Sequence, residues 1–262
     1  MVSRRSVGVR APAFLSRPPS HGQAFVVLCS LFLARARRQW RPYLVVSTAM
    51  PSGIVLLLGL VGHLGRTAGS IATVGAMDLV LGITAVTLLA QQVSEAVHNG
   101  YFDMLRTLPV APVLVLLALF VSAGIFAVPG LVVVALLGHL LYGAALRPDL
   151  GVPVVLVLTS LALGGIGAFV GLAANSEAVA GLIGNLVMML VLFLGIVPAR
   201  HMPAWVILVR DVLPVGAAAD ALGTTLRAGV PAPWQIAVLC AWTVAGAVAV
   251  SRRALSERRR GL

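Results

Sequence analysis

Residues able to do chemistry are few and scattered in this chain of 262 residues, which holds five histidines and eight acidic residues. The histidines lack the short spacings by which proteins bind a metal ion. No two acidic residues share one face of an apolar segment. The sequence therefore predicts no metal site and no catalytic site, and the chain is not expected to be an enzyme by itself.

The basic residues limit nucleotide chemistry, because all 19 of them are arginine. A standard P-loop needs a lysine to reach the β- and γ-phosphates, so the chain cannot form one. Gly165-Ile166-Gly167 looks like a nucleotide loop, but it lies within an apolar run. Gly167 and Gly171 have GxxxG spacing, which favours close helix packing. If the protein uses ATP, another polypeptide must hydrolyse it.

Around these residues the chain is strongly apolar, with 60% hydrophobic and 10% charged residues and a mean hydropathy of +1.03. A soluble globule of this size needs a larger polar surface. Several apolar runs reach the roughly 20 residues that cross a bilayer core of ~30 Å. We therefore predict an all-α integral membrane protein with six transmembrane helices. The spans are expected near residues 43–62, 71–93, 112–142, 152–174, 179–198 and 233–251.

The third span could be one helix or a hairpin, because residues 107–146 carry no charge. As one straight helix this run would be ~60 Å long, and Pro129-Gly130 could instead turn the chain. Arginine clusters stand at both ends of the protein, which requires an even number of crossings under the positive-inside rule. One long third helix gives six crossings, so we favour it over the hairpin.

The net charge of +11 is concentrated at the two ends of the chain. A basic balance can indicate a nucleic-acid partner, but arginine-rich ends with sparse loops are what the positive-inside rule predicts for two cytoplasmic termini. We therefore expect membrane lipids as partners and no nucleic acid. The arginines at the two ends are 4, 5, 10, 17, 35, 37, 38 and 41 before the first span, and 252, 253, 258, 259 and 260 after the last; the loops between the spans hold only 66, 106, 147, 200, 210 and 227.

The segments that flank the spans have distinct compositions. Residues 1–20 are rich in Arg, Ser and Pro and are predicted to lack fixed structure. Residues 21–42 are predicted to form an amphipathic helix in the cytoplasmic interface. A cleaved signal peptide is the alternative there, but the arginines directly after the apolar stretch would resist translocation. Residues 252–262 form a basic cytoplasmic tail.

The long segment 199–232, between spans five and six, is predicted to lie outside. Pro203 and Pro214 divide it, and each is followed by a half-apolar pattern. We expect two short helices that form an extracellular cap, with no further crossing of the membrane.

Asp78 is the one acidic residue inside a predicted span. A charge at such depth costs at least ~2.5 kcal/mol on insertion scales. Asp78 could therefore line a transport path or latch a neighbouring helix; the alternative is a protonated or water-reached acid near the rim. Span five could line an apolar transport path as well, through Asn185, Met189 and Phe193. The alternative is that these residues face lipid or pack against other helices.

The stretch EAVHNGYFDMLRTLPVAP, residues 95–112, lies on the cytoplasmic side in this topology. Glu95 to Leu108 can form a short helix that ends at Pro109. It would present an apolar ridge together with charges, which suits the groove of a partner protein. An ordinary interfacial loop is the alternative. The residues expected to matter are Glu95, Gly100, Tyr101, Phe102, Leu105 and Pro109.

The pattern of Glu95, Gly100, Leu105 and Leu108-Pro109-Val110 resembles the permease family of type 2 ABC exporters. The resemblance extends from about residue 22 over nearly the whole chain, and the drug-resistance branch is the nearest match. Here Ala111-Pro112 stands where many relatives have a basic or hydroxyl residue. Other shared features are Pro51 in the first span, Met202-Pro203-Ala204-Trp205 and Leu213-Pro214.

This resemblance implies that residues 95–109 contain the coupling helix that docks into an ABC ATPase subunit. Two ATPase copies, which would bind ATP and Mg²⁺, and a second transmembrane subunit, identical or related, complete such a complex. The expected function is ATP-driven export of a hydrophobic, amphipathic or lipid-like molecule across a bacterial inner membrane. An ion-coupled secondary carrier or channel, or a structural membrane scaffold, is the alternative.

Overall fold

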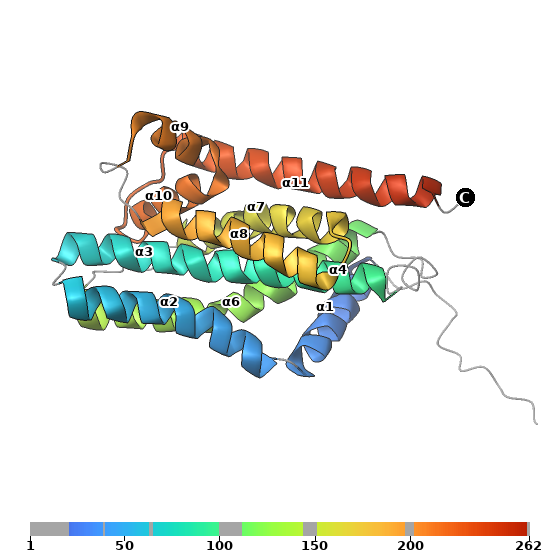
Figure 1. The fold of residues 1–262 in the computed structure, drawn as a ribbon, viewed down its shortest axis with the longest axis horizontal. Helices are drawn as coiled ribbons and strands as arrows, with labels where there is room; N and C mark the ends of the chain where they lie inside the picture. The colour runs from blue at the N-terminus through green and yellow to red at the C-terminus, as the bar shows by residue number, and fades with distance from the viewer. Residues whose placement is uncertain are drawn as a thin grey trace, which may run out of the picture.

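The computed structural model describes residues 21–38, 40–62, 65–99, 112–143, 151–196 and 202–260. Within these ranges every regular element is a helix, which confirms the predicted all-α class (Figure 1). The helices are α1 His21–Arg38, α2 Trp40–Gly62, α3 Arg66–Gly82, η2 Ile83–Leu88, α4 Leu89–His98, α6 Pro112–Tyr142, α7 Gly151–Ala173, α8 Glu177–Ile196, α9 Ala204–Val212, α10 Pro214–Thr225 and α11 Pro233–Arg260.

Six helical segments in the described part of the chain are long and apolar enough to cross a membrane, as predicted. The third is the single helix α6 of 31 residues, so the hairpin at Pro129-Gly130 does not form. At ~1.5 Å per residue this helix is about 46 Å long, longer than the apolar core of a bilayer. The last helix extends past the predicted span and includes most of the predicted basic tail.

The bundle has two ends, which are formed by different helices. What we call the cap end carries α9 and α10 together with the start of α3 and the end of α6. What we call the α1 end carries α1, the C-terminus of α4, the turn between α7 and α8, and the C-terminal end of α11 (Figure 1). Of the predicted interfacial segment 21–42, α1 takes His21–Arg38, and Trp40 already begins α2.

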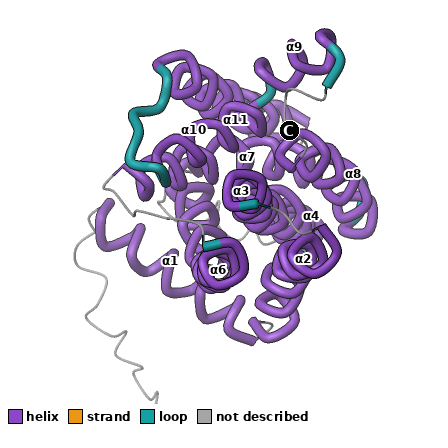
Figure 2. The backbone as a smooth tube through the Cα atoms, turned by 90° about the vertical axis from the view of Figure 1, so that its left-hand side faces the viewer, coloured by secondary structure: helices purple, strands orange, loops and turns teal. Residues whose placement is uncertain are grey.

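The second span is the central element of the bundle. Helices α3, η2 and α4 run on without a break from Arg66 to His98, and 94% of an apolar 18-residue stretch of this span is buried inside the protein. The end-on view shows α3 with other helices on all sides (Figure 2). It packs against α2, α6, α7, α8 and α10. In the last span only 17% of the corresponding stretch is buried. The protein therefore encloses the second span and leaves most of the last span uncovered.

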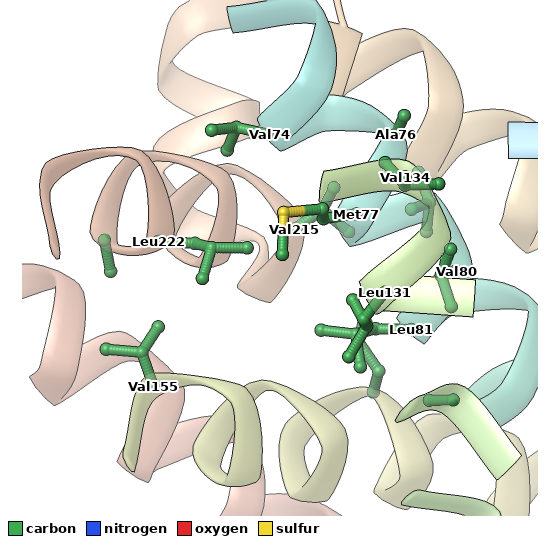
Figure 3. Packing of buried hydrophobic residues seen from close by; sticks show 14 of the residues in the cluster. Val74, Ala76, Met77, Val80, Leu81, Leu131, Val134, Val155, Val215 and Leu222 are labelled. Carbon is green, nitrogen blue, oxygen red and sulfur yellow. The ribbon is translucent and has the colours of Figure 1, made fainter. Parts of the chain in front are cut away.

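Buried apolar side chains from four helices meet around α3 (Figure 3). Met77 and Leu81 of α3 belong to one cluster with Leu131 of α6, Val155 of α7 and Leu222 of α10. Because α3 contributes to this cluster along most of its length, a shift of α3 must also disturb the helices around it.

Glycines let α7 approach the second span closely. A Cβ atom on Gly167 would clash with the carbonyl oxygen of Ala85, and one on Gly171 would lie 2.5 Å from the carbonyl oxygen of Ala90. On its other side α7 packs on α11, where Gly165 and Gly246 face each other. The GxxxG pair singled out in the sequence therefore lies at the α7 contact with η2 and α4.

Candidate functional site

The predicted coupling segment begins differently from what the sequence suggested. Glu95 belongs to α4, which continues the second span to His98 and ends in a turn at Asn99. It is therefore wrong that one separate short helix starts at Glu95. The apolar pattern of the span persists through Val97, so the helix continues to the turn. The other coupling residues, namely Gly100, Tyr101, Phe102, Leu105 and Pro109, lie outside the described residues.

His98 joins the last turn of α4 to the turn between α7 and α8. Its Nε2 lies 2.8 Å from the carbonyl oxygen of Asn175, and its Nδ1 lies 2.8 Å from that of Ser94. A ring with protons on both nitrogens donates to both oxygens, whereas a neutral ring donates to only one. This contact spans 77 positions in sequence. It fixes the end of the second span against the neighbouring connection at the α1 end.

A polar groove of about 510 Å³ opens between α4 and α8, near the same end. Gln91 and Asn185 supply amide groups, and Glu177 supplies a carboxylate, while the rest of the lining is small or apolar. The amide and carboxylate groups of this lining can hydrogen-bond a polar headgroup, and the apolar residues beside them can contact its apolar atoms. The complete lining is Gln91, Glu177, Ala178, Gly181, Leu182 and Asn185.

The structure does not bring all the predicted path residues together. Met189 and Phe193 point away from the bundle with 64% and 55% of their surfaces exposed, on the same side of α8 as Leu182 and Leu186. This exposed stripe extends from the groove toward the cap end. Asp78, in contrast, is enclosed within the bundle and does not meet Met189 or Phe193 on one surface.

Asp78 lies in the middle of α3 and is fully buried. Neither of its carboxylate oxygens has a hydrogen-bond partner among the described residues. One turn before it, Val74 faces Gly223 of α10; one turn after it, Gly82 faces Val191 of α8. Asp78 therefore points toward the region where α8 and α10 meet.

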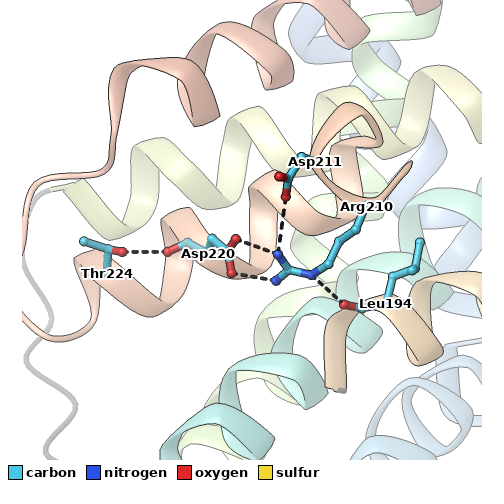
Figure 4. A network of polar contacts seen from close by, with 5 residues as sticks. All are labelled: Leu194, Arg210, Asp211, Asp220 and Thr224. Carbon is cyan, nitrogen blue, oxygen red and sulfur yellow. Dashed lines mark hydrogen bonds and ion pairs between the residues drawn. The ribbon is translucent and has the colours of Figure 1, made fainter. Parts of the chain in front are cut away.

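A buried arginine occupies that region (Figure 4). The guanidinium of Arg210 on α9 donates to both carboxylate oxygens of Asp220 on α10, at 2.6 and 2.7 Å. Its Nε donates to the carbonyl oxygen of Leu194 on α8 at 3.1 Å. Thr224 donates to the carbonyl oxygen of Asp220. One side chain thus holds three helices together at the cap end.

Charges around Arg210 favour its protonated form. The hydrogen bonds with Asp220 raise the pKa of Arg210, and the negative charges of Asp220, Asp211 and Asp78 raise it further, while burial acts in the opposite direction. Asp211 lies 3.7 Å from Nη1 but is 43% exposed, so its contribution is screened by solvent. The bidentate pair with Asp220 is the main interaction.

Sequence reasoning placed these residues in the cap but did not connect them. Arg210 and Asp220 stand on either side of Pro214, and Asp78 is more than a hundred positions away. The available signal was modest: Arg210 and Asp211 directly follow the apolar run Trp205–Val209, shortly before the helix-starting Pro214. A charge at the end of such a run often has a buried partner.

Comparison with known protein families adds one finding. A family model described as ABC-2 type transporter matches residues 23–226, which includes α1 to α10 and ends before α11. No curated protein matches the chain.

Proposed function

Because the chain belongs to the ABC-2 type transporter family, and is therefore a permease subunit of an ABC transporter, we propose that it exports a hydrophobic or amphipathic molecule. The power would come from a separate ATPase subunit that docks at the α1 end. The observation that carries this proposal is the family match over a six-span bundle whose most buried span leads directly into residues 95–109.

Docking at the α1 end is supported by what gathers there. The C-terminus of α4 and the short turn between α7 and α8 both lie at this end, and His98 of α4 contacts the carbonyl oxygen of Asn175 in that turn. The arginines of residues 35–41 and 252–260 are next to it in sequence. Under the positive-inside rule this is the cytoplasmic side, where ATP is available. We assign both termini to the cytoplasm of a bacterial cell and the cap to the outside.

The second span is suited to carry a movement from the ATPase into the bundle. It is one continuous helical rod from Arg66 to His98, in contact with five other helices. Its middle, Ile83–Leu88, is a π-helical segment in which Thr84 donates to the carbonyl oxygens of Val80 and Leu81. Such segments are frequent at functional sites. A push at His98 would therefore reach α7, α8 and α10.

The substrate path would begin at the groove between Gln91 and Asn185. The exposed stripe of Met189 and Phe193 continues from it toward the cap end. A polar start followed by an apolar stripe suits an amphipathic molecule that enters from the inner leaflet. The stripe needs a second wall, which we assign to a second transmembrane subunit, identical or related, as in the drug-resistance branch of the family.

The first test is co-purification with an ABC ATPase subunit expressed together with this protein. Glu95→Trp and Gly100→Trp should abolish both co-purification and transport in membranes or proteoliposomes, without lowering membrane insertion. The matched control is Gly65→Trp at the cap end, where a Cβ atom meets nothing within 4 Å. Transport and co-purification that persist in both test variants would contradict the coupling role.

The second test concerns sidedness. A reporter fused after His98 should be active only in the cytoplasm, and one fused between α10 and α11 only outside. The opposite result, or ATP hydrolysis by the purified chain alone, would contradict the proposed division of labour between permease and ATPase.

A further inference from the structure

The cap end holds two carboxylates near one buried guanidinium. Asp220 is paired with Arg210, whereas Asp78 has no hydrogen-bond partner among the described residues although it is fully buried. A buried carboxylate without a partner costs several kcal/mol. In the state described here Asp78 must therefore carry a proton. It can ionise only in a state in which a cation pairs with it. An unpaired buried group of this kind calls for a physical explanation.

Two contacts place Asp78 beside the elements that hold the guanidinium. Val74, one turn before Asp78, faces Gly223 of α10, and Gly223 is three residues after Asp220. Gly82, one turn after Asp78, faces Val191 of α8. Residues one helical turn apart lie on the same face, so Asp78 points at the gap between Asp220 and α8.

The Arg210 side chain lies in that gap. Its Nε is bonded to the carbonyl oxygen of Leu194, which is three residues after Val191 on α8. Its two Nη atoms are bonded to Asp220 of α10. Asp78 points at this gap from the side of α3. Once ionised, it is therefore placed to compete with Asp220 for the guanidinium.

The two carboxylates differ in their access to solvent. The side chain of Asp220 is 36% exposed, that of Arg210 is 6% exposed, and Asp78 is 0% exposed. When Arg210 leaves Asp220, water can take its place there. Without Arg210, however, no solvent reaches an ionised Asp78. Since an arginine side chain has several rotatable bonds and a forked head, it can change partners while its backbone stays in place.

We propose that Arg210 exchanges carboxylates during transport, paired with Asp220 in the state described here and with Asp78 in a second state. In the first state the cap helix α9 is fastened to α10, and in the second it is fastened to the second span. The exchange links movement of α3 to movement of the cap at the far end from the ATPase. This inference rests on the proposed function, because it assigns a use to the movement of the second span.

A double-mutant cycle on protein stability tests the exchange. Asp220→Asn should lower the melting temperature only slightly, because Asp78 takes over the guanidinium. Asp78→Asn should not lower it, since a buried carboxyl without a partner is removed. The double variant leaves Arg210 buried without either carboxylate and should lose about 5 °C or more beyond the sum of the single effects. Additive effects would overturn the proposal.

Transport provides the second readout. Asp78→Asn should bind the ATPase and support ATP hydrolysis as the natural protein does, while transport falls at least tenfold. The matched control is Thr67→Val, which changes an exposed polar side chain at the start of the same helix α3 and should leave both transport and the melting temperature unchanged. Transport at the natural rate by Asp78→Asn would overturn the exchange.

The two readouts separate this inference from the proposed function. If the natural protein fails to bind any ATPase, the proposed function fails, yet the melting temperatures still report whether Asp78 and Asp220 compensate for each other. If the ATPase binds and the melting temperatures are additive, the proposed function stands and the exchange is wrong.

Discussion

The two ends of the bundle use polar residues in opposite ways. At the cap end, a buried arginine ties α8, α9 and α10 together, and its partners are fixed by short hydrogen bonds. At the α1 end, His98 and Glu177 are exposed, and Gln91 and Asn185 line an open groove. Buried polar contacts contribute strongly to the stability of one arrangement, whereas exposed ones contribute little and leave their groups available to ligands.

This contrast indicates a division of labour within one bundle. The cap end is held together from within the chain, which suits a structure that must open and close as a unit. The α1 end offers groups that a partner or substrate can contact. The glycines agree with this picture, because a Cβ atom on Gly216 would clash with the backbone of Arg210, whereas one on Gly181 would meet only the amide nitrogen of Gln91 at 2.7 Å.

The largest effect is expected from Arg210→Met. Removing the guanidinium leaves the carboxylate of Asp220 and the carbonyl oxygen of Leu194 without their donor, so the free energy of unfolding should fall by about 3–5 kcal/mol. Unfolding in detergent micelles measures this. The control is Arg227→Met, whose exposed side chain bonds only the carbonyl oxygen of Gly223 in its own helix region. Equal losses in both variants would show that burial of the Arg210 guanidinium adds nothing to the stability of the cap end.

A smaller effect is expected from one added methyl group at each end. Gly216→Ala should lower the free energy of unfolding by about 1–3 kcal/mol, because the backbone of Arg210 must move. Gly181→Ala should cost less than about 0.5 kcal/mol, since the flexible end of Gln91 can rotate away. The two unfolding curves, measured under the same conditions, check this. The reverse order would mean that the α1 end is the more tightly packed one.

In the groove we expect a change in transport without a change in stability. Asn185→Leu removes an exposed amide and should leave the free energy of unfolding within about 0.5 kcal/mol, while transport of an amphipathic substrate falls several-fold. Ile183→Ala, at an exposed position on another face of α8, is the control for a general effect on that helix. Full transport by Asn185→Leu would remove this residue from the path.

A small loss of stability is expected from His98→Ala. The variant loses hydrogen bonds to Asn175 and Ser94 at an exposed position, which costs about 0.5–1.5 kcal/mol. Substrate should also stimulate ATP hydrolysis less than it does in the natural protein, because the end of the second span is no longer held to Asn175. This decrease should be easier to measure than the loss of stability. A loss of stability as large as that of Arg210→Met would show that both ends are equally structural.

The six spans could be predicted from sequence because the apolar runs alone match the thickness of a bilayer. The position of Asp78 in a span and the two short cap helices were readable for the same reason: charge and proline are rare enough in these runs to mark depth and breaks. The second span was predicted to end near residue 93, whereas its helix continues to His98. Helix boundaries depend on local turn geometry at Asn99 that composition does not report.

The pairing between helices could not be read from the sequence. In a run such as α6, apolar residues cover all sides of the helix, so no periodicity tells which face meets the protein and which meets lipid. The contacts Arg210–Asp220 and His98–Asn175 join residues that share no motif. The sequence by itself determined the class of protein, the number of crossings and the basic ends, because these follow from transfer of side chains between water and membrane. Only the tertiary structure decided that Arg210 pairs with Asp220 and that Asn185 lies in a groove, because these depend on how helices rotate about their axes when they pack.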